Sequence, residues 1–194
     1  AGTHEVSVID RPGLHEKLAK LSGGQGASDA AASAADVASD LSFLLGLRRR
    51  INLPGRGPRG LAILGGRAYV TQYFSDDLAV VGFGASGAGR VRSIALGPHL
   101  VMTPRRKGEL FFNDASLCFQ QWQSCETCHP DARADGLNWD LLNDGIGNPK
   151  NVRSMLLAHK TPPAMSLGVR EDAEYAVRSG IKFIQFAVRP ESDA

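Results

Sequence analysis

Residues 57–83 read GPRGLAILGGRAYVTQYFSDDLAVVGF, and this stretch decides the fold that the sequence predicts. Its apolar and polar positions alternate in short runs, as they do in strands that bury one face. The breaks at Gly65-Gly66 and at Ser75-Asp76-Asp77 have the composition of tight turns. The stretch therefore predicts three consecutive antiparallel strands, at residues 60–64, 68–73 and 78–83.

Two further strand segments flank this stretch. Residues 91–96 follow a glycine-rich break and extend the series to a four-stranded meander. Val6, Val8 and Ile9 form a similar run near the start of the chain. Residues 12–46 lie between that run and the meander and are interpreted as an insertion. Its centre, residues 22–40, has few large apolar side chains and is expected to be a mobile loop.

An internal echo favours one architecture for these strands. Three residues of one segment recur about 43 residues later, which is close to the period of one propeller blade. The echoing residues are Arg49, Ile51 and Leu53 with Arg92, Ile94 and Leu96. Val6, Val8 and Ile9 likewise echo Leu78, Val80 and Val81, at a longer shift that the insertion at residues 12–46 would explain. We therefore predict a partial antiparallel β-propeller at residues 1–100, with one full blade at about residues 47–98. A small antiparallel sandwich with an accidental echo is the alternative.

The pattern becomes helical after about residue 100. Thr103 followed by Pro104 is a typical helix start, with Thr as the N-cap and Pro at the first helical position. Leu110 and Phe111 would supply the apolar face of that helix. A second helix is predicted at residues 171–179, with Gly180 as its end. The second half therefore predicts small helices joined by long loops.

The composition excludes several classes of protein. The chain has 22 Lys and Arg against 20 Asp and Glu in 194 residues, so its formal net charge is +2. A balance this close to neutral gives no field that points to nucleic acid as the main partner. No run approaches the roughly 18 uninterrupted apolar residues of a membrane span. Three cysteines are too few for a disulfide scaffold, so the fold must rest on an apolar core or on a bound group.

Residues 125–129, Cys-Glu-Thr-Cys-His, carry the strongest functional signal in the sequence. The C-x-x-C-H arrangement is typical of covalent attachment of a c-type haem. Two residues between the thiols place both sulfurs on one side of a tight turn, where each can form a thioether with a vinyl group of one porphyrin. The imidazole that follows is then directed at the iron as its proximal ligand. We therefore predict haem c and its iron, bound by Cys125, Cys128 and His129.

A zinc half-site and a thioredoxin-like redox pair are the competing interpretations of this motif. A structural zinc site needs two further ligands, and the sequence downstream has no second Cys pair and no His-x-His cluster. A thioredoxin motif belongs to a strand-to-helix turn within a βαβ unit, which this region does not predict. Cys118, the remaining cysteine, is expected to be a small buried apolar side chain rather than a third redox group.

The second axial ligand of the iron decides between electron transfer and reaction with small molecules. A Met ligand raises the reduction potential, a second His lowers it, and an open position admits a small molecule such as peroxide. The candidates downstream of the motif are Met155, His159 and Met165. His159 and Met165 flank a stiff Pro-Pro loop, and Met165 is our first choice, with His159 as the alternative.

Other side chains near the motif have expected roles beside a porphyrin. Trp122 and Trp139 are interpreted as wall residues that pack on the ring rather than as electron relays. Four basic residues are candidates to pair with the haem propionates, with a solvated basic surface as the equal alternative: Arg133, Lys150, Arg153 and Lys160.

Two parts of the chain resemble known families. Residues 57–63, 67–71 and 77–81 resemble a repeat of the YVTN-type β-propeller family, with Gln72 where that family usually has Asn. The second half, residues 103–194, resembles the first cytochrome domain of the bacterial di-haem cytochrome c peroxidase and methylamine-utilisation family. Besides the haem motif, this resemblance is carried by residues 107–112, 135–137, 148–151 and 154–157.

These resemblances imply a multidomain fold, in which partial antiparallel β-propeller blades are followed by an all-α cytochrome c domain at residues 103–194. They also imply missing propeller blades, a second haem domain and a cytochrome c peroxidase-like oxidoreductase activity. Peroxidases of that family carry a His or a Tyr in the loop after the motif. Residues 131–147 have neither and offer Trp139, Asp135, Asp140 and Asp144 instead. The sequence therefore leaves open whether this chain is an enzyme.

The predicted function is one-electron transfer by the covalent haem, as part of a di-haem peroxidase-like redox protein. We expect the partner to be a redox protein or a small oxidant such as peroxide, without nucleic acid and without a membrane span. The alternative is a propeller-based binding module in which the haem domain is a sensor or a structural element. Because covalent haem is attached outside the cytoplasm, a periplasmic or exported protein is expected. The chain starts at Ala1 with no signal peptide, and we interpret it as a processed form or a fragment.

Overall fold

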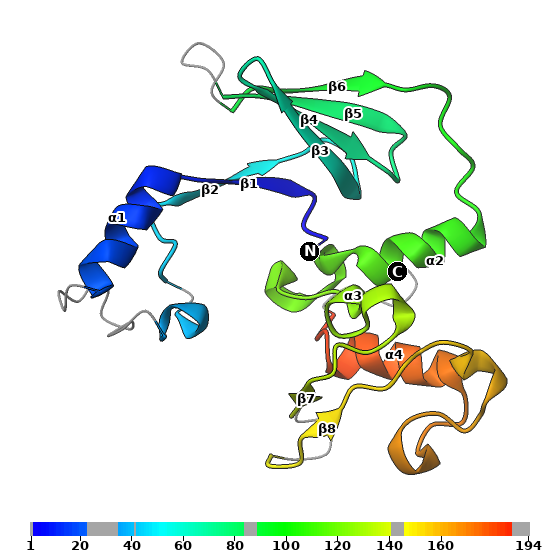
Figure 1. The fold of residues 1–194 in the computed structure, drawn as a ribbon. Helices are drawn as coiled ribbons and strands as arrows, with labels where there is room; N and C mark the ends of the chain where they lie inside the picture. The colour runs from blue at the N-terminus through cyan, green and yellow to red at the C-terminus, as the bar shows by residue number, and fades with distance from the viewer. Residues whose placement is uncertain (1, 23–34, 41, 84–88, 141–145, 188–194) are drawn as a thin grey trace. The chain divides into compact units, whose positions relative to one another are not determined.

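The computed structural model describes residues 2–22, 35–40, 42–83, 89–140 and 146–187 (Figure 1). The chain divides into two compact units. One unit is Glu5–Leu53, and the other combines Ala1–His4 with Pro54–Ala194. Among the described residues, no helix has both the length and the apolar character that are needed to cross a membrane.

The described residues of the unit Glu5–Leu53 form a strand pair, one α-helix and one short 3-10 helix. Strand β1 (Glu5–Ile9), predicted from its alternation, pairs antiparallel with β2 (Arg48–Asn52), and the helices are α1 (Arg11–Ser22) and the short 3-10 helix η1 (Val37–Ser39). Leu21 and Phe43 are buried together in a small apolar core. Helix α1 occupies the start of the segment that was interpreted as an insertion loop, and residues 23–34 of that segment lie outside the described range.

The predicted four-stranded meander is confirmed. Strands β3 (Pro58–Leu64), β4 (Arg67–Gln72), β5 (Asp77–Gly82) and β6 (Val91–Ala95) lie side by side in that order and are antiparallel throughout. Gly65 and Gly66 have φ values of +57° and +70° and form the two-residue turn between β3 and β4. Positive φ at both positions is typical of a hairpin turn whose twist matches that of the strands.

The sequence echo corresponds to two strand pairs with the same register. Val6 lies opposite Ile51 in β1–β2, and the matching residues Leu78 and Ile94 lie opposite each other in β5–β6. The pair β1–β2 nevertheless forms a sheet of its own and does not extend the sheet of β3 to β6. The echo therefore reflects a repeated strand pair rather than successive propeller blades.

The segment after residue 100 holds short helices and one small ladder. Helix α2 (Pro104–Asn113) begins as predicted, because the Thr103 side chain accepts a hydrogen bond from the Arg106 N–H. Helix α3 (Cys125–Cys128) is a single turn, and α4 (Ala173–Phe183) begins at the cap residue Asp172. The remaining elements are η2 (Ala115–Leu117), η3 (Phe119–Gln121), η4 (Pro130–Ala132), η5 (Ala158–Lys160), η6 (Ser166–Gly168), and the ladder of β7 (Asn138–Trp139) with β8 (Lys150–Asn151).

The predicted end of the last helix was wrong. Gly180 was expected to stop the helix, but α4 continues through it to Phe183. A glycine inside a helix costs about 1 kcal/mol relative to alanine, which a tertiary contact at the helix end can offset. Such a contact is present, because the Phe119 N–H donates to the Gln185 carbonyl over 2.8 Å.

The predicted fold class was also wrong. Propeller blades followed by an all-α cytochrome c domain were expected, whereas the described residues form a small α/β arrangement of four α-helices and three small antiparallel sheets. After residue 103 the described chain has two helices of 10 and 11 residues, one single turn and a two-residue ladder. These elements do not make an all-α domain. The physical reason is local: Pro and Gly recur between residues 130 and 168 and limit the helices to short lengths.

Arg106 connects α2 to the turn between β4 and β5. Its guanidinium donates to the Tyr73 carbonyl over 2.6 Å and to Asp76 Oδ1 over 2.9 Å, and it lies 4.8 Å from the centre of the Tyr73 ring. Asp76 in turn accepts from the Leu100 N–H over 2.8 Å. A planar guanidinium can make such bonds and stack at the same time, so one side chain fixes the helix against the sheet.

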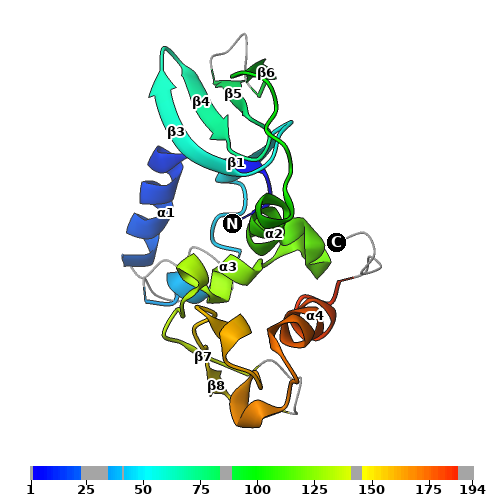
Figure 2. The ribbon, with the colours of Figure 1, turned by 90° about the vertical axis from the view of Figure 1, so that its right-hand side faces the viewer.

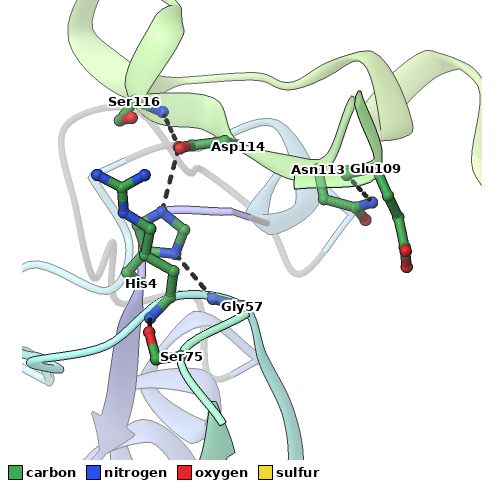
Figure 3. Close-up of polar contacts among 8 residues, drawn as sticks. His4, Gly57, Ser75, Glu109, Asn113, Asp114 and Ser116 are labelled. Carbon is green, nitrogen blue, oxygen red and sulfur yellow. Dashed lines mark hydrogen bonds and ion pairs between the residues drawn. The ribbon is translucent and has the colours of Figure 1, made fainter. Parts of the chain in front are cut away.

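Gly2 and His4, which belong to the same unit as α2, are bound to the residues that directly follow the C-terminal end of α2 (Figure 3). The Gly57 N–H donates to His4 Nδ1 over 3.2 Å, and His4 Nε2 lies 3.2 Å from Asp114 Oδ1. Since Nδ1 accepts, a ring proton is assigned to Nε2, which faces the carboxylate. The Ser116 N–H donates to the same carboxylate over 2.8 Å, and the Gly2 carbonyl accepts from the Ala115 N–H. His4 thus joins the Gly57 loop to the end of α2.

Candidate functional site

The two motif cysteines stand on the single helical turn α3. Residues three apart on a helix share a face, so Cys125 and Cys128 project from the same side of this turn. The Ser124 N–H donates to Thr127 Oγ1 over 3.0 Å, which fixes the start of the turn. Helix α3 contacts α2, and Figures 1 and 2 both place the β7–β8 ladder on the side of α3 away from α2.

Both thiols are half-buried, and burial is the main influence on their acidity. Burial raises the pKa of Cys125 and outweighs the lowering by a backbone hydrogen bond, and the neighbouring Cys128 and Cys118 make smaller contributions that also raise it. Burial also raises the pKa of Cys128, and the charge of Asp135 adds to this effect. Desolvation disfavours a thiolate, so both groups are held as neutral thiols.

The His129 ring is oriented by its own loop. Its Nδ1 lies 3.2 Å from the Arg133 carbonyl, which can only accept, so the ring proton is assigned to Nδ1. The backbone N–H of His129 donates to the Cys125 carbonyl over 2.9 Å and closes the α3 turn. This arrangement leaves Nε2 with its lone pair as the ligand atom. Ligand histidines are commonly held in this way, through a hydrogen bond from the other ring nitrogen.

Asp135 organises the loop after His129. Its carboxylate accepts from the Leu137 N–H over 2.9 Å and from Trp139 Nε1 over 2.8 Å, while its own N–H donates to the Cys128 carbonyl over 3.2 Å. The hydrogen bond from Leu137 is the main cause that lowers the pKa of Asp135. The indole of Trp139 is therefore held in a fixed place near the motif, whereas Trp122 is exposed.

The described chain around and after the motif has no apolar core of its own. None of the apolar side chains in residues 125–140 and 146–187 is buried. Many large ones are exposed instead, and they include Leu137, Ile146, Leu156, Leu157, Met165, Leu167, Val169, Tyr175, Val177, Phe183 and Phe186. Side chains of this kind pack readily against a large flat apolar group.

The structure places the three candidate second ligands in different settings. The Met155 N–H donates to the Ala132 carbonyl over 2.9 Å, which brings Met155 to the loop that follows His129. His159 belongs to η5, which contacts α4. Met165 is 48% exposed and has φ +71° and ψ 175°, a backbone region that is almost confined to glycine.

The remaining predicted residues divide by exposure. Cys118 is 4% exposed, as expected for a small buried side chain. The four basic candidates, Arg133, Lys150, Arg153 and Lys160, lie on the surface. Sequence reasoning missed the bonds of Asp135 to Leu137 and Trp139 and the roles of Gln123 and Gln185, which are both buried. The Asp-Gly pair at residues 135–136 was the available signal for a turn held by an Asp side chain.

No group of three or more His, Cys, Asp or Glu side chains that could hold a metal ion occurs in the part of the chain that the structure describes. No protein-family model matches the sequence, and no curated protein and no solved structure was found to match it. The assignment to a YVTN-type propeller fused to a di-haem cytochrome domain is therefore wrong. It depended on short local patterns, and the described residues form mostly small antiparallel sheets with few short helices.

Proposed function

We propose that this chain carries one covalently attached haem and transfers single electrons. Cys125 and Cys128 hold the porphyrin by two thioether bonds, and His129 Nε2 is the proximal iron ligand. The bond between His129 Nδ1 and the Arg133 carbonyl carries this proposal, because it directs Nε2 away from its own loop. A bound haem supplies a one-electron couple at its iron, and the chain sets the ligands, the burial and the access.

The chemistry of the donor set fits this group. Cys125 and Cys128 are free thiols on one side of a single turn, and each would add across a vinyl group, with the sulfur bonding to one carbon and the proton going to the other. The exposed apolar side chains that follow the motif supply a surface for the porphyrin faces. The surface guanidinium groups of Arg133 and Arg153 can pair with the propionates.

Met165 is the proposed second iron ligand, with His159 as the alternative. The support for Met165 is its half-exposed side chain and its backbone conformation, which costs about 1–3 kcal/mol and is typical of functional positions. A thioether ligand would raise the reduction potential and favour electron transfer. The proposed partner is a redox protein or a small oxidant such as peroxide, and the proposed location is periplasmic or exported.

Covalent attachment is tested by producing the chain in a bacterial periplasm together with a haem-attachment apparatus. The pyridine haemochrome spectrum separates haem with two thioethers from haem with one. We expect two thioethers in the unsubstituted chain and one in Cys125→Ala or Cys128→Ala. Cys118→Ala is the matched control and keeps two. A chain that binds stoichiometric zinc and no haem under these conditions would contradict the proposal.

The ligand roles are tested by optical spectra of the oxidised and reduced protein. His129→Gly should lose the proximal ligand, and added imidazole should restore the original bands. Met165→Ala should abolish the weak sulfur-to-iron band of the oxidised form, whereas His159→Ala should leave it unchanged. If His159→Ala alone alters the spectrum, the alternative ligand is correct. If only Met155→Ala does so, both assignments are wrong.

A further inference from the structure

A hydrogen-bonded loop joins Asp135 to the turn that carries the motif. The Asp135 N–H donates to the Cys128 carbonyl over 3.2 Å, and so closes the loop behind Cys128. Within the loop, the Ala132 N–H donates to the His129 carbonyl over 2.9 Å, and His129 Nδ1 lies 3.2 Å from the Arg133 carbonyl. The backbone of Asp135 is therefore fixed directly to the residue that precedes the proximal ligand of the proposed haem.

Two donors hold the Asp135 carboxylate in place. The Leu137 N–H donates to Oδ1 over 2.9 Å, and Trp139 Nε1 donates to Oδ2 over 2.8 Å. Trp139 belongs to β7, which pairs with β8, so the indole donor stands on a ladder rather than on a free loop. Hydrogen bonds to an ionised acceptor are about twice as strong as those between neutral groups. Because each oxygen has its own donor, the charge of Asp135 has a fixed position.

The charges of Asp135 and of the motif act on each other. The Leu137 N–H is the main cause that lowers the pKa of Asp135, the Trp139 indole adds to it, and the charge of His129 makes a further contribution in the same direction. Burial is the main cause that raises the pKa of Cys128, and the charge of Asp135 raises it further. Asp135 is therefore ionised at neutral pH, and its charge reaches the two residues at the end of the motif.

We propose that Asp135 lowers the reduction potential of the haem iron, a role that rests on the haem function proposed above. The ferric iron carries one positive charge more than the ferrous iron, so a fixed negative charge beside its proximal ligand favours the ferric state. Trp139 and Leu137 are positioning residues, because they hold this charge in place and do not carry it. The protein thereby adjusts the one-electron couple through a loop side chain that is not itself a ligand.

Potentiometric titration of the chain with covalently attached haem tests this role. Asp135→Asn removes the charge and keeps an oxygen that can accept one hydrogen bond. We expect this variant to shift the midpoint potential in the positive direction, with a several-fold rise in the equilibrium constant for reduction. Asp140→Asn is the matched control, because it removes the same charge from a carboxylate that binds the Gly147 N–H over 2.6 Å, and its shift should be clearly smaller. Added salt should reduce the difference between the two variants, since it screens exposed charges.

Three results would overturn the proposal. They are an unchanged potential in Asp135→Asn, equal shifts in the two variants, and a shift that comes with altered ligand bands, because the ligands and not the charge would then have changed. Each of these leaves the covalent haem in place, so the proposed function survives. A chain that takes up no covalent haem contradicts the proposed function and, with it, the role of Asp135. The two failures are thus distinguishable.

Exchange of the indole N–H groups with solvent, measured by NMR in the reduced protein, tests the position of the charge without a variant. The Trp139 Nε1–H is bound to the carboxylate and should exchange slowly, whereas Trp122 is 58% exposed and should exchange fast. Asp140→Asn should leave the Trp139 rate unchanged, and Asp135→Asn should raise it because a neutral acceptor binds more weakly. Equal rates for the two indoles in the unsubstituted chain would show that the carboxylate is not held, which contradicts the proposal.

Discussion

Asp114 shows how single residues determine the stability of this chain. Its side chain is 3% exposed at the end of α2, beside His4 and the Ser116 N–H (Figure 3). Burial, the largest influence, raises the pKa of this carboxyl, but the hydrogen bonds from His4 and Ser116 outweigh it and lower the pKa to about 2 from 3.8. A carboxyl that is more acidic in the folded state stabilises that state whenever it is ionised.

The stabilisation by Asp114 should depend on pH. The stabilisation is fully present above pH 3.8, the pKa of the unfolded state, where the carboxyl is ionised in both states. It is lost as the pH falls toward about 2, because the carboxyl then becomes protonated in the folded state as well. Asp114→Asn should therefore cost about 2 kcal/mol at pH 7 and much less near pH 2. Unfolding by urea across this pH range measures the difference. A cost for Asp114→Asn that is the same at both ends of the range would contradict the assignment.

Gly57 should tolerate no larger side chain. Its φ is +71°, and an added Cβ would lie 2.4 Å from Cδ2 of the buried Phe74 ring. Gly57→Ala should destabilise the protein by about 3 kcal/mol, through backbone strain together with overpacking. Gly65→Ala is the matched control, because φ is +57° there and nothing lies within 4 Å of the added atom. Thermal or denaturant unfolding should show a clearly smaller loss for the control.

The sequence predicted the identity of the motif residues but not what surrounds them. The spacing of Cys125, Cys128 and His129 is visible in five consecutive letters. The carbonyl that orients His129 belongs to Arg133 and depends on left-handed backbone at Asp131 and Ala132, with φ +52° and +58°. Asp is enriched in this backbone region, but the region is uncommon for alanine, and the sequence therefore does not predict it at Ala132.

At the scale of elements, helix α2 is the clearest case in which N-cap chemistry in the sequence predicts where a helix begins. Thr103 and Pro104 predicted its first residue, and the Thr103 hydroxyl does accept the Arg106 N–H. Helix α1 was missed, although Leu14, Leu18 and Leu21 recur at helical spacing in residues 11–22. The Gly-rich and Ser-rich residues that follow favour a loop, and this composition masks the helical periodicity.

Removing the cap of α2 should weaken this helix. Thr103→Ala leaves the Arg106 N–H without its acceptor and should cost about 1 kcal/mol of unfolding free energy. Thr103→Ser retains the hydroxyl, and because Ser is at least as good an N-cap as Thr, it should cost no unfolding free energy. Hydrogen exchange at the Arg106 amide, measured with the unfolding free energy, should quicken in the alanine variant alone. Equal exchange rates in the two variants would show that the cap contributes nothing.

At the scale of the whole molecule, the fold class could not be predicted because it depends on which segments pair. The alternation of β1 is the same whether it pairs with β2 alone or enters a larger sheet. Local pattern identified the meander, since its strands pair with their neighbours in sequence. In residues 125–140 and 146–187, short helices and loops alternate without a buried apolar side chain that would indicate how they assemble.

Arg106 should couple the stability of the sheet to that of α2, so that loss of its bonds weakens both elements. Arg106→Ala removes the bonds to the Tyr73 carbonyl and Asp76 and should cost about 2 kcal/mol. Arg105→Ala, at the exposed neighbouring position, is the matched control and should change little. Hydrogen exchange should quicken both at the β4–β5 turn and in α2 for the first variant. Quickening on only one side would show that Arg106 does not couple the two elements.

The neighbour-to-neighbour order of β3, β4, β5 and β6 has a consequence for the timing of folding. Strands that pair only with adjacent strands close short loops, and chains rich in such contacts fold quickly. All four strands are complete by Ala95, thirty residues before Cys125 is synthesised. We expect the sheet to form before the segments after residue 103 become ordered. The turn that carries the two thiols would then fold last, connected through α2 to a sheet that is already formed.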